Sequence, residues 1–276
     1  MQEKQLLSLP KYPVTSIPSG GISYPEDWTI EISPYTFGQS SGIKETNIAS
    51  KRFYNIVLDG VYTNFDKSQL ILEDILYLSI ARKLISSQSS KITLTTLCPV
   101  CLTENKLSDE IVNILKFESS KITNRSKYPI KVTFSKYIGW YRYLTLDENL
   151  SILNNDSIKN PISTNIAMRT VKLVEITGNS EEAEKVIYDE NTSSKSKPNI
   201  DMLKNIYESF IDEDSAILDE LISVFESMKL LPIEVTCTEL TCKNVYKKDL
   251  NIGALTDFLS PFCPDGVTKV KDSIDL

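Results

Sequence analysis

Two pairs of cysteines restrict the folds open to this chain more than any other feature. The first pair is Cys98-x-x-Cys101, a spacing at which two thiolates on one turn reach a single tetrahedral metal ion, and the second is Cys237 and Cys242. Each pair follows a β-like segment, which suits a zinc-ribbon arrangement of two hairpin turns. Because 135 residues lie between the pairs, a shared metal requires the fold to bring the chain back to its first turn.

A closed site of these four cysteines would hold one structural zinc ion and would contribute directly to the folding free energy. The alternative is four ordinary reduced thiols in the interior, since free cysteine is often buried. The second pair is more widely spaced than usual, and no glycine follows Cys101 or Cys242 to relax the turn. A thioredoxin-like redox role for the first pair is disfavoured, because the following Leu-Thr-Glu-Asn-Lys is not typical of the required helix. Cys263 has no partner at a metal-binding spacing and is expected to be a lone thiol.

The chain contains no histidine, which argues against most enzymatic mechanisms. Histidine is the commonest general base, the partner of most serine and cysteine nucleophiles, and a ligand in most catalytic zinc sites. The net charge of -7 disfavours nucleic acid and anionic membranes as main partners. There is no secretory signal or membrane-length apolar run, so we expect a soluble, non-enzymatic protein of the cytoplasm.

The hydrophobic pattern predicts an α+β fold with antiparallel strands around a central buried helix. That helix is expected from Asp66, which begins a capping box with Gln69, to Leu84, because apolar residues cover most of its circumference. Two successive helices, capped by Asn199 and Ser215, are expected to form a helical hairpin. Alternating β-branched and apolar residues predict strands at Lys91–Leu97, Tyr128–Tyr137, Met168–Thr177 and Pro232–Thr236.

Composition divides the chain into four parts. Residues 1–40 are rich in proline, glycine and aromatic residues and are predicted to be a β or extended segment that docks on another subunit more than on this chain's own core. Residues 41–187 are the predicted α+β core with inserted strands, and 188–199 a polar, flexible linker. Residues 200–276 are expected to carry the helical hairpin, the second cysteine turn and a last helix at Leu250–Leu259.

Three other motifs are weaker candidates for function. Asp212-Glu-Asp214 is expected to cap a helix start, not to bind metal. Pro18-Ser-Gly-Gly21 lacks the Lys-Ser/Thr and helix of a phosphate-binding loop and is predicted to be a turn. Trp140-Tyr-Arg-Tyr143 mixes aromatic side chains with a cation, as single-strand nucleic-acid sites do, but in an acidic chain we expect it at an interface or core edge.

Several short motifs occur in a fixed order along the chain. They are Leu9-Pro-Lys-Tyr-Pro-Val, Pro18-Ser-Gly, the long apolar helix, the strand into Cys98-Pro-Val-Cys101, and the ending Phe225-Glu-Ser-Met, Val235-Thr-Cys237, Cys242 and Leu250-Asn-Ile-Gly-Ala-Leu-Thr-Asp-Phe258. Taken in order, these features resemble the baseplate hub and hub assembly proteins of contractile-tailed, T-even-like bacteriophages. The chain departs from that pattern in its wider second cysteine pair and in extra sequence between Lys121 and Asn199.

The resemblance implies a structural or assembly role in the hub of a virion tail baseplate, built in the host cytoplasm, without catalysis. Its partners would be other phage baseplate and tail proteins in a multi-subunit assembly, with no nucleic acid and no membrane. The alternative is a zinc-ribbon module that binds nucleic acid or regulates another protein, which would need a basic face.

Overall fold

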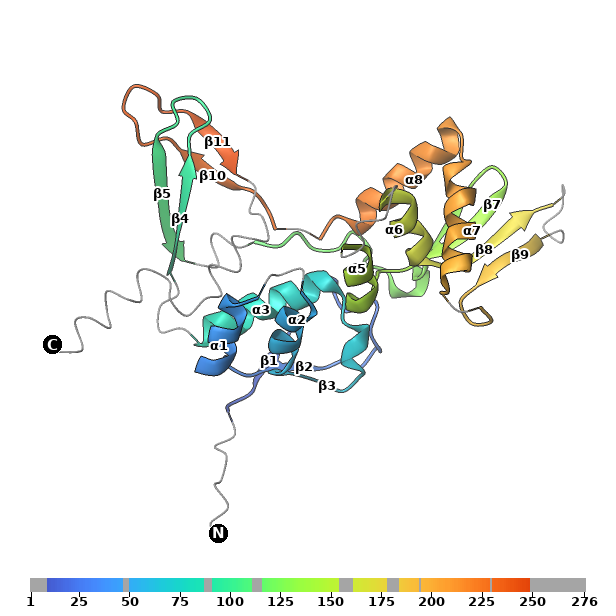
Figure 1. Cartoon of the computed structure of the whole chain (residues 1–276), viewed down its shortest axis with the longest axis horizontal. Helices are drawn as coiled ribbons and strands as arrows, with labels where there is room; N and C mark the ends of the chain where they lie inside the picture. The colour runs from blue at the N-terminus through green and yellow to red at the C-terminus, as the bar shows by residue number, and fades with distance from the viewer. Residues whose placement is uncertain are drawn as a thin grey trace, which may run out of the picture.

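The computed structural model describes residues 9–46, 50–86, 91–110, 116–153, 161–177, 184–193, 195–228 and 230–248. Helices and antiparallel sheets form a mixed α/β structure (Figure 1). Two β-hairpins stand at one end of the long axis, a four-stranded sheet with its helices lies at the other end, and the first three helices lie between them. The last helix expected from the sequence, at Leu250–Leu259, and Cys263 lie outside the described residues.

The N-terminal part combines a small sheet with three helices. Strands β1 (Tyr12–Val14), β2 (Ile30–Ile32) and β3 (Val61–Thr63) pair antiparallel in that order. Thr36 and Gln39 form a reciprocal capping box at the start of one helix, and the Ser50 side chain accepts a hydrogen bond from the amide of Phe53 at the start of the next. The three helices are α1 (Phe37–Lys44), α2 (Lys51–Leu58) and α3 (Leu72–Ser86).

Helix α3 is the buried helix that the apolar pattern indicated, although it begins later than predicted. Asp66 caps only a short 3-10 turn, Lys67–Gln69, and Leu70 is extended, so the α-helix starts at Leu72. Buried positions occur on several sides of the helix because the N-terminal sheet, α2 and the C-terminal part all pack around it. They are Asp74, Ile75, Leu76, Leu78, Ser79, Ile80 and Arg82.

Arg82 is a fully buried arginine that ties α3 to α2 and to the loop after β2. Its guanidinium donates to the carbonyl oxygens of Ile56 and Val57 at the end of α2, at 3.0 and 2.7 Å, and to that of Ser33 at 2.8 Å. These are carbonyls that a helix end and a loop leave without backbone partners. Gly60 lies so close that an added Cβ would fall 2.0 Å from Arg82 Nη2, so a side chain at this position would displace the buried guanidinium from its carbonyl partners.

The prediction that residues 1–40 dock mainly on another subunit is wrong for the residues described from Leu9 onward. Most of their apolar side chains are buried within this chain's own core, although Leu9, Tyr12 and Phe37 are exposed. Strand β2 also pairs with β3 across the boundary predicted at residue 40. The buried side chains are those of Ile17, Ile22, Tyr24, Ile30, Ile32 and Tyr35. Asp74, in the first turn of α3, accepts hydrogen bonds from Ser19 N (3.0 Å), Ser19 Oγ (2.6 Å) and Tyr24 Oη (2.6 Å). The glycine-rich turn is therefore anchored to the central helix, by a buried carboxylate that the sequence did not identify.

The C-terminal part is a four-stranded antiparallel meander with helices packed beside it (Figure 1). The predicted strand Tyr128–Tyr137 is divided by a turn between β6 and β7, while Met168–Thr177 contains β8. The predicted helical pair exists, but α7 and α8 start at Lys197 and Asp212, before the expected caps Asn199 and Ser215. The elements are β6 (Ile130–Thr133), β7 (Tyr137–Tyr141), β8 (Thr170–Ile176), β9 (Glu184–Asp189), α5 (Leu146–Leu153), α6 (Pro161–Arg169), α7 (Lys197–Glu208) and α8 (Asp212–Phe225).

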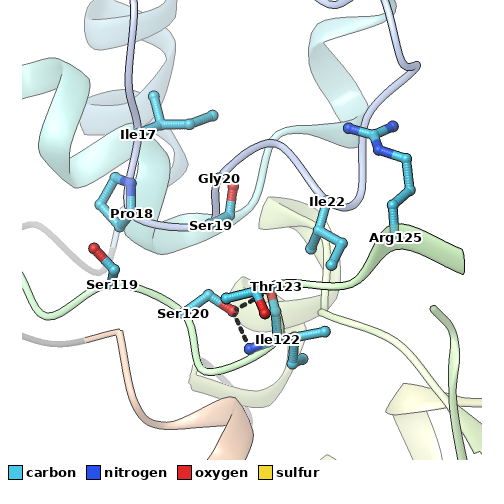
Figure 2. A pocket seen from close by; sticks show the side chains of 10 residues that line it. All are labelled: Ile17, Pro18, Ser19, Gly20, Ile22, Ser119, Ser120, Ile122, Thr123 and Arg125. Carbon is cyan, nitrogen blue, oxygen red and sulfur yellow. Dashed lines mark hydrogen bonds between the residues drawn. The ribbon is translucent and has the colours of Figure 1, made fainter. Parts of the chain in front are cut away.

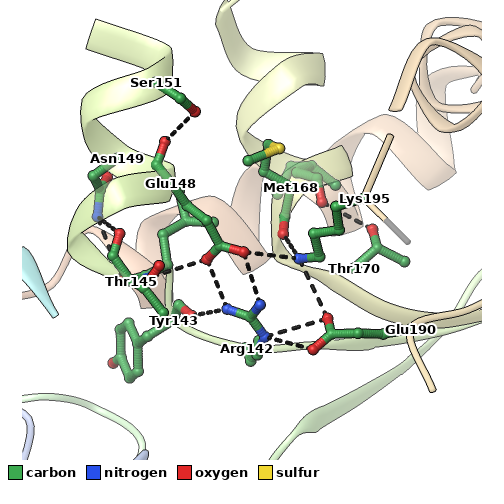
Figure 3. A network of polar contacts seen from close by, with 12 residues as sticks. Arg142, Tyr143, Thr145, Glu148, Asn149, Ser151, Met168, Thr170, Glu190 and Lys195 are labelled. Carbon is green, nitrogen blue, oxygen red and sulfur yellow. Dashed lines mark hydrogen bonds and ion pairs between the residues drawn. The ribbon is translucent and has the colours of Figure 1, made fainter. Parts of the chain in front are cut away.

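The predicted flexible linker, 188–199, is wrong at both ends, because it begins in β9 and ends in α7. Its middle carries half of a charge network (Figure 3). Arg142 forms a bidentate pair with Glu148, both bonds 2.8 Å long, and its Nε lies 3.4 Å from Glu190. Lys195 Nζ lies 3.5 Å from Glu148 and 3.3 Å from Glu190, and it also donates to the carbonyl of Met168. Two cations and two carboxylates thus fasten this segment to α5 and the end of β7.

Within the described part of the chain, no helix is both long and apolar enough to cross a membrane.

Candidate metal centre

The four paired cysteines lie in the turns of two β-hairpins that are far apart in sequence. The first hairpin joins β4 (Lys91–Leu97) to β5 (Glu104–Glu110), and the second joins β10 (Ile233–Thr236) to β11 (Val245–Lys248). Each cysteine pair begins at the residue directly after a strand, as in Leu97-Cys98 and Thr236-Cys237. In Figure 1 the two turns meet at the outer end of the hairpins, away from the helices.

The four sulfur atoms occupy the space that one small cation would need. Cys98 Sγ lies 3.8 Å from Cys242 Sγ, and Cys101 Sγ lies 3.5 Å from Cys237 Sγ. All four lie within 4.8 Å of one another. These separations are far longer than the ~2.05 Å of a disulfide bond. They bracket the ~3.8 Å sulfur–sulfur edge of a tetrahedron built with metal–sulfur bonds of ~2.3 Å. The residues therefore fit a tetrahedral metal ion with four thiolate ligands.

The two turns have related backbones despite their different lengths. Cys98 N donates to Thr103 O at 3.0 Å in the first turn, and Cys237 N donates to Asn244 O at 2.8 Å in the second. In each turn the residue after the last cysteine has a positive φ, 60° at Leu102 and 46° at Lys243. Glycine adopts this conformation without strain, whereas a residue with a Cβ is disfavoured there. Leu102 and Lys243 thus adopt the turn conformation at the two positions, after Cys101 and Cys242, where the sequence lacks the glycine that such a turn favours.

A buried asparagine braces one turn against the other. Asn105, on β5, is 1% exposed, and its Oδ1 accepts from both the amide (2.7 Å) and the hydroxyl (2.9 Å) of Thr238, the residue after Cys237. Its Nδ2 donates to Thr103 O at 3.0 Å and to Tyr246 Oη at 3.2 Å. One amide side chain thus satisfies groups from both hairpins and sets the position of the two cysteine turns relative to each other.

The bases of the hairpins are also joined. Phe117 and Leu230 form an isolated antiparallel bridge, and Leu231 N donates to Lys116 O at 2.7 Å. The segment that follows the first hairpin and the segment that leads into the second therefore run side by side. The pair of hairpins is held at the base by backbone hydrogen bonds and at the outer end by the cysteine cluster.

Hydrogen bonding favours the thiolate form in the first turn. Interaction with Thr103, whose Oγ1 lies 3.3 Å from Cys101 Sγ, lowers the pKa of Cys101 to about 6. Burial opposes ionisation of Cys98, but the amides of Cys101 and Val100 outweigh it, so the pKa of Cys98 is also lowered. The first turn consequently offers two sulfurs that ionise readily, which is the form that binds metal.

The second turn resists ionisation unless positive charge is supplied. The amide of Asn244 favours the Cys242 thiolate, but burial and the three neighbouring cysteines raise the pKa of Cys242 to about 12. Burial also raises the pKa of Cys237. Four thiolates in contact repel one another, and a divalent cation at their centre would remove that repulsion.

The weaker sequence candidates have structural explanations. Asp212, Glu213 and Asp214 form the acidic first turn of α8, where negative charge is favoured, but none of them caps the helix through its side chain as expected. Asp214 instead accepts two 2.8 Å hydrogen bonds from the amide and hydroxyl of Ser135, which anchor the helix to the turn after β6. Trp140 lies on β7 with Lys131 and Lys172 5.5 and 5.4 Å from its ring, as cross-strand neighbours on one sheet. Neither motif gathers groups around an open space.

Figure 2 shows a cavity of about 240 Å³ between the glycine-rich turn and residues 119–125. Ile17, Ile22 and Ile122 supply its apolar wall. Ser120 Oγ is already engaged with the backbone of Ile122, and Arg125 with the carbonyls of Tyr24 and Gly21. The polar groups of this cavity therefore hold its own walls together, and the cysteine cluster is the better supported site.

Comparison of the chain with protein-family models, with curated proteins and with solved structures finds no match.

Proposed function

We propose that Cys98, Cys101, Cys237 and Cys242 hold one zinc ion in a closed structural site, in the manner of a zinc ribbon. The observation that carries this proposal is the convergence of four sulfur atoms within 4.8 Å from two hairpins separated by 135 residues. Four soft thiolates in a tetrahedron select zinc or iron among the common metals, and zinc is the usual ion at such structural sites.

The site is proposed to stabilise the fold and not to catalyse a reaction. A catalytic zinc ion keeps one position for water or substrate, whereas four cysteine ligands fill the tetrahedron. Isolated two-stranded hairpins are only marginally stable in water. A structural zinc ion contributes ~10–16 kcal/mol of apparent binding free energy in small zinc-binding domains, and here that energy would hold two such hairpins together.

Metal analysis of the purified full-length chain tests this proposal. We expect about one zinc per chain, and a strong chelator should lower the melting temperature, because a bound ion stabilises the state that binds it. Cys101→Ser and Cys242→Ser should each lose zinc and melt at lower temperature, whereas the matched control Cys263→Ser should keep both properties. A metal-free chain that melts at the same temperature with and without added zinc would leave four reduced thiols in place of the site.

For the whole chain we propose a structural or assembly role in a multi-subunit particle, as the resemblance to baseplate hub proteins suggests. Support comes from the absence of histidine and from a site whose ligands leave no room for chemistry. The alternative, a zinc ribbon that binds nucleic acid, is less favoured because residues 91–110 and 230–248 contain five lysines and five acidic residues.

Co-sedimentation separates these two roles. If the chain belongs to a contractile tail, a tagged copy expressed during infection should sediment with purified tail or baseplate particles and should resist a moderate-salt wash. Free chain should pass through a heparin column at the same salt. Strong retention on heparin without particle association would favour the nucleic-acid alternative.

A further inference from the structure

Two close sulfur contacts within the cysteine cluster run from one hairpin to the other. Cys101 Sγ lies 3.5 Å from Cys237 Sγ, and Cys98 Sγ lies 3.8 Å from Cys242 Sγ. In each contact one cysteine comes from the turn after β4 and the other from the turn after β10. Because a disulfide bond is ~2.05 Å long, each pair of sulfurs would have to approach by only roughly 1.5–1.8 Å to bond. The side chains that fit a metal ion are therefore also placed for two bonds between the hairpins.

The two turns are held side by side by contacts that need no metal ion. The side chain of Asn105 accepts two hydrogen bonds from Thr238 and donates one to the hydroxyl of Tyr246, on β11. At the base of the hairpins, Leu231 N donates to Lys116 O at 2.7 Å. Loss of an ion from the cluster would therefore leave the turns in place, with each sulfur beside a sulfur of the other hairpin.

One of the four cysteines is open to a reagent from solvent. Cys101 is exposed, whereas Cys98 and Cys237 are buried and Cys242 is intermediate. Peroxides oxidise the accessible sulfur of a site first, because the reaction needs direct contact between the sulfur and a peroxide oxygen. Oxidation of the cluster is thus expected to begin at Cys101, with Cys237 as the thiol that resolves the oxidised sulfur.

We propose that the cysteine cluster is a redox-sensitive clamp, in which hydrogen peroxide replaces the zinc ion by disulfide bonds between the hairpins. The Cys101 thiolate attacks one peroxide oxygen, the O–O bond breaks, and a sulfenic acid and hydroxide result. The Cys237 thiolate then displaces a second hydroxide from that sulfur, and the Cys101–Cys237 bond forms. In total, two thiolates lose two electrons to one peroxide molecule, and two protons convert the hydroxides to water.

The first disulfide opens the closed metal site, because only two of the four ligands remain. These two, Cys98 and Cys242, form the second disulfide in the same way, and the zinc ion is released. In a thioredoxin-like dithiol the two cysteines of one turn pair with each other, whereas here both bonds join the hairpins. Zinc thus holds the hairpins together in a reducing compartment and disulfides do so in an oxidising one. The release of zinc rests on the proposed metal site, but the disulfide pairing rests on the sulfur contacts alone.

Oxidation of the zinc-loaded full-length Cys263→Ser chain tests this proposal, since the substitution removes the lone thiol that could exchange with the cluster. Trypsin cleavage at lysine leaves the first cysteine pair in one peptide, 92–106, and the second pair in another, 230–243. After hydrogen peroxide treatment we expect the loss of four thiols, the release of one zinc ion per chain, and these two peptides joined in a digest made without reductant. A dithiol reductant with added zinc should restore the starting state.

Two single variants in the same background, each lacking one ligand, separate the roles of the sulfurs. Cys242→Ser keeps the contact between Cys101 and Cys237, so it should oxidise as fast as the metal-free parent and join the two peptides. Cys101→Ser lacks the exposed sulfur and should oxidise at least about 10-fold more slowly. Equal oxidation rates of the two variants would contradict the entry of peroxide at Cys101.

The digest of the parent chain decides the proposal even if a variant fails to fold. Unlinked peptides, each lacking two hydrogen atoms, would show that disulfides form within each turn and would overturn the proposal. Zinc content before oxidation separates it from the metal site. A zinc-loaded chain whose thiols survive a large excess of peroxide contradicts only the redox clamp. A chain that binds no zinc but joins the two peptides contradicts the metal site and supports the pairing between hairpins.

Discussion

Replacing Asn105 by alanine tests how the two cysteine turns are held together. The substitution removes four hydrogen bonds, but the groups left behind differ in cost. Thr103 O still accepts from Cys98 N, and the hydroxyls of Thr238 and Tyr246 lie on residues with some solvent exposure. The main losses are the partner of Thr238 N and a small cavity. An unpaired amide costs ~1–3 kcal/mol when it is buried, and because Thr238 is exposed we expect a total loss of about 1–3 kcal/mol in unfolding free energy, the cavity included.

Urea denaturation of Asn105→Ala in the presence of zinc measures that loss, and competition with a chromophoric chelator measures zinc affinity. Because Asn105 positions a residue adjacent to a proposed ligand, zinc affinity should fall by about 10- to 100-fold. Thr238→Ala keeps the backbone hydrogen bond and is the matched control, with an expected loss of at most about 1 kcal/mol. The reasoning fails if Asn105→Ala and Thr238→Ala are equally stable and bind zinc equally, since the asparagine would then not brace the turns.

Three further substitutions test the interior. Leu76→Asp buries an unpaired charge on α3 at a cost of several kcal/mol and should prevent soluble folding, so wild-type-like melting of this variant would contradict the central position of that helix. Thr96→Val should raise the unfolding free energy by about 1 kcal/mol in urea titrations, because the Thr96 hydroxyl is buried without a partner among the described residues; a decrease would show that the hydroxyl is satisfied. Burial raises the pKa of Glu73 from 4.5 to about 7, so the folded state holds this proton more tightly than the unfolded state. Stability from this group is complete below pH ~4.5 and falls by ~3 kcal/mol as the pH rises to ~7, and Glu73→Gln should flatten that part of the stability profile.

The sequence identified those elements whose pattern is local. Lys91–Leu97 alternates β-branched and apolar residues, and the strand β4 has these bounds. The strand predicted at Pro232–Thr236 contains β10, and the two late helices are present because their apolar residues recur with helical spacing. Spacing alone also selected the four cysteines that the fold brings together.

The errors arose where tertiary contacts decide the structure. The capping box that starts at Asp66 predicts an α-helix directly after it. In the structure Leu70 is extended, and Ile71 forms an antiparallel β-bridge with Thr145 from the C-terminal part. Thr36 and Gln39 form a regular capping box that does begin a helix, directly after a proline-rich segment in which no helix was expected. The prolines and glycines of residues 1–40 predict open strand edges for a partner, but the buried carboxylate of Asp74 binds Ser19 and Tyr24 and holds the described part of this segment in the core.

The parts of the site that the sequence missed are contacts between distant residues. Asn105 belongs to no recognisable sequence motif. Its role in positioning the cysteine turns follows only from its hydrogen bond with Thr238, 133 residues away. The polar composition of 188–199 predicts disorder, but Glu190 and Lys195 of this segment belong to a charge network whose other members, Arg142 and Glu148, lie on different elements. Composition describes a segment in isolation and cannot show which charges the fold will place beside it.

Because 135 residues separate the two cysteine turns, the ribosome makes the first cysteine pair well before the second. At a synthesis rate of roughly 5–20 residues per second, Cys98 and Cys101 emerge roughly 7–27 s before Cys237 does. During that interval the first turn is a dithiol with half of its proposed ligands, while the four-stranded sheet and its helices are still being made. A zinc ion can be fully enclosed only after the last strands have been synthesised and have returned to the first hairpin. The proposed metal would then be retained only by chains in which the second hairpin has been made and has folded back onto the first.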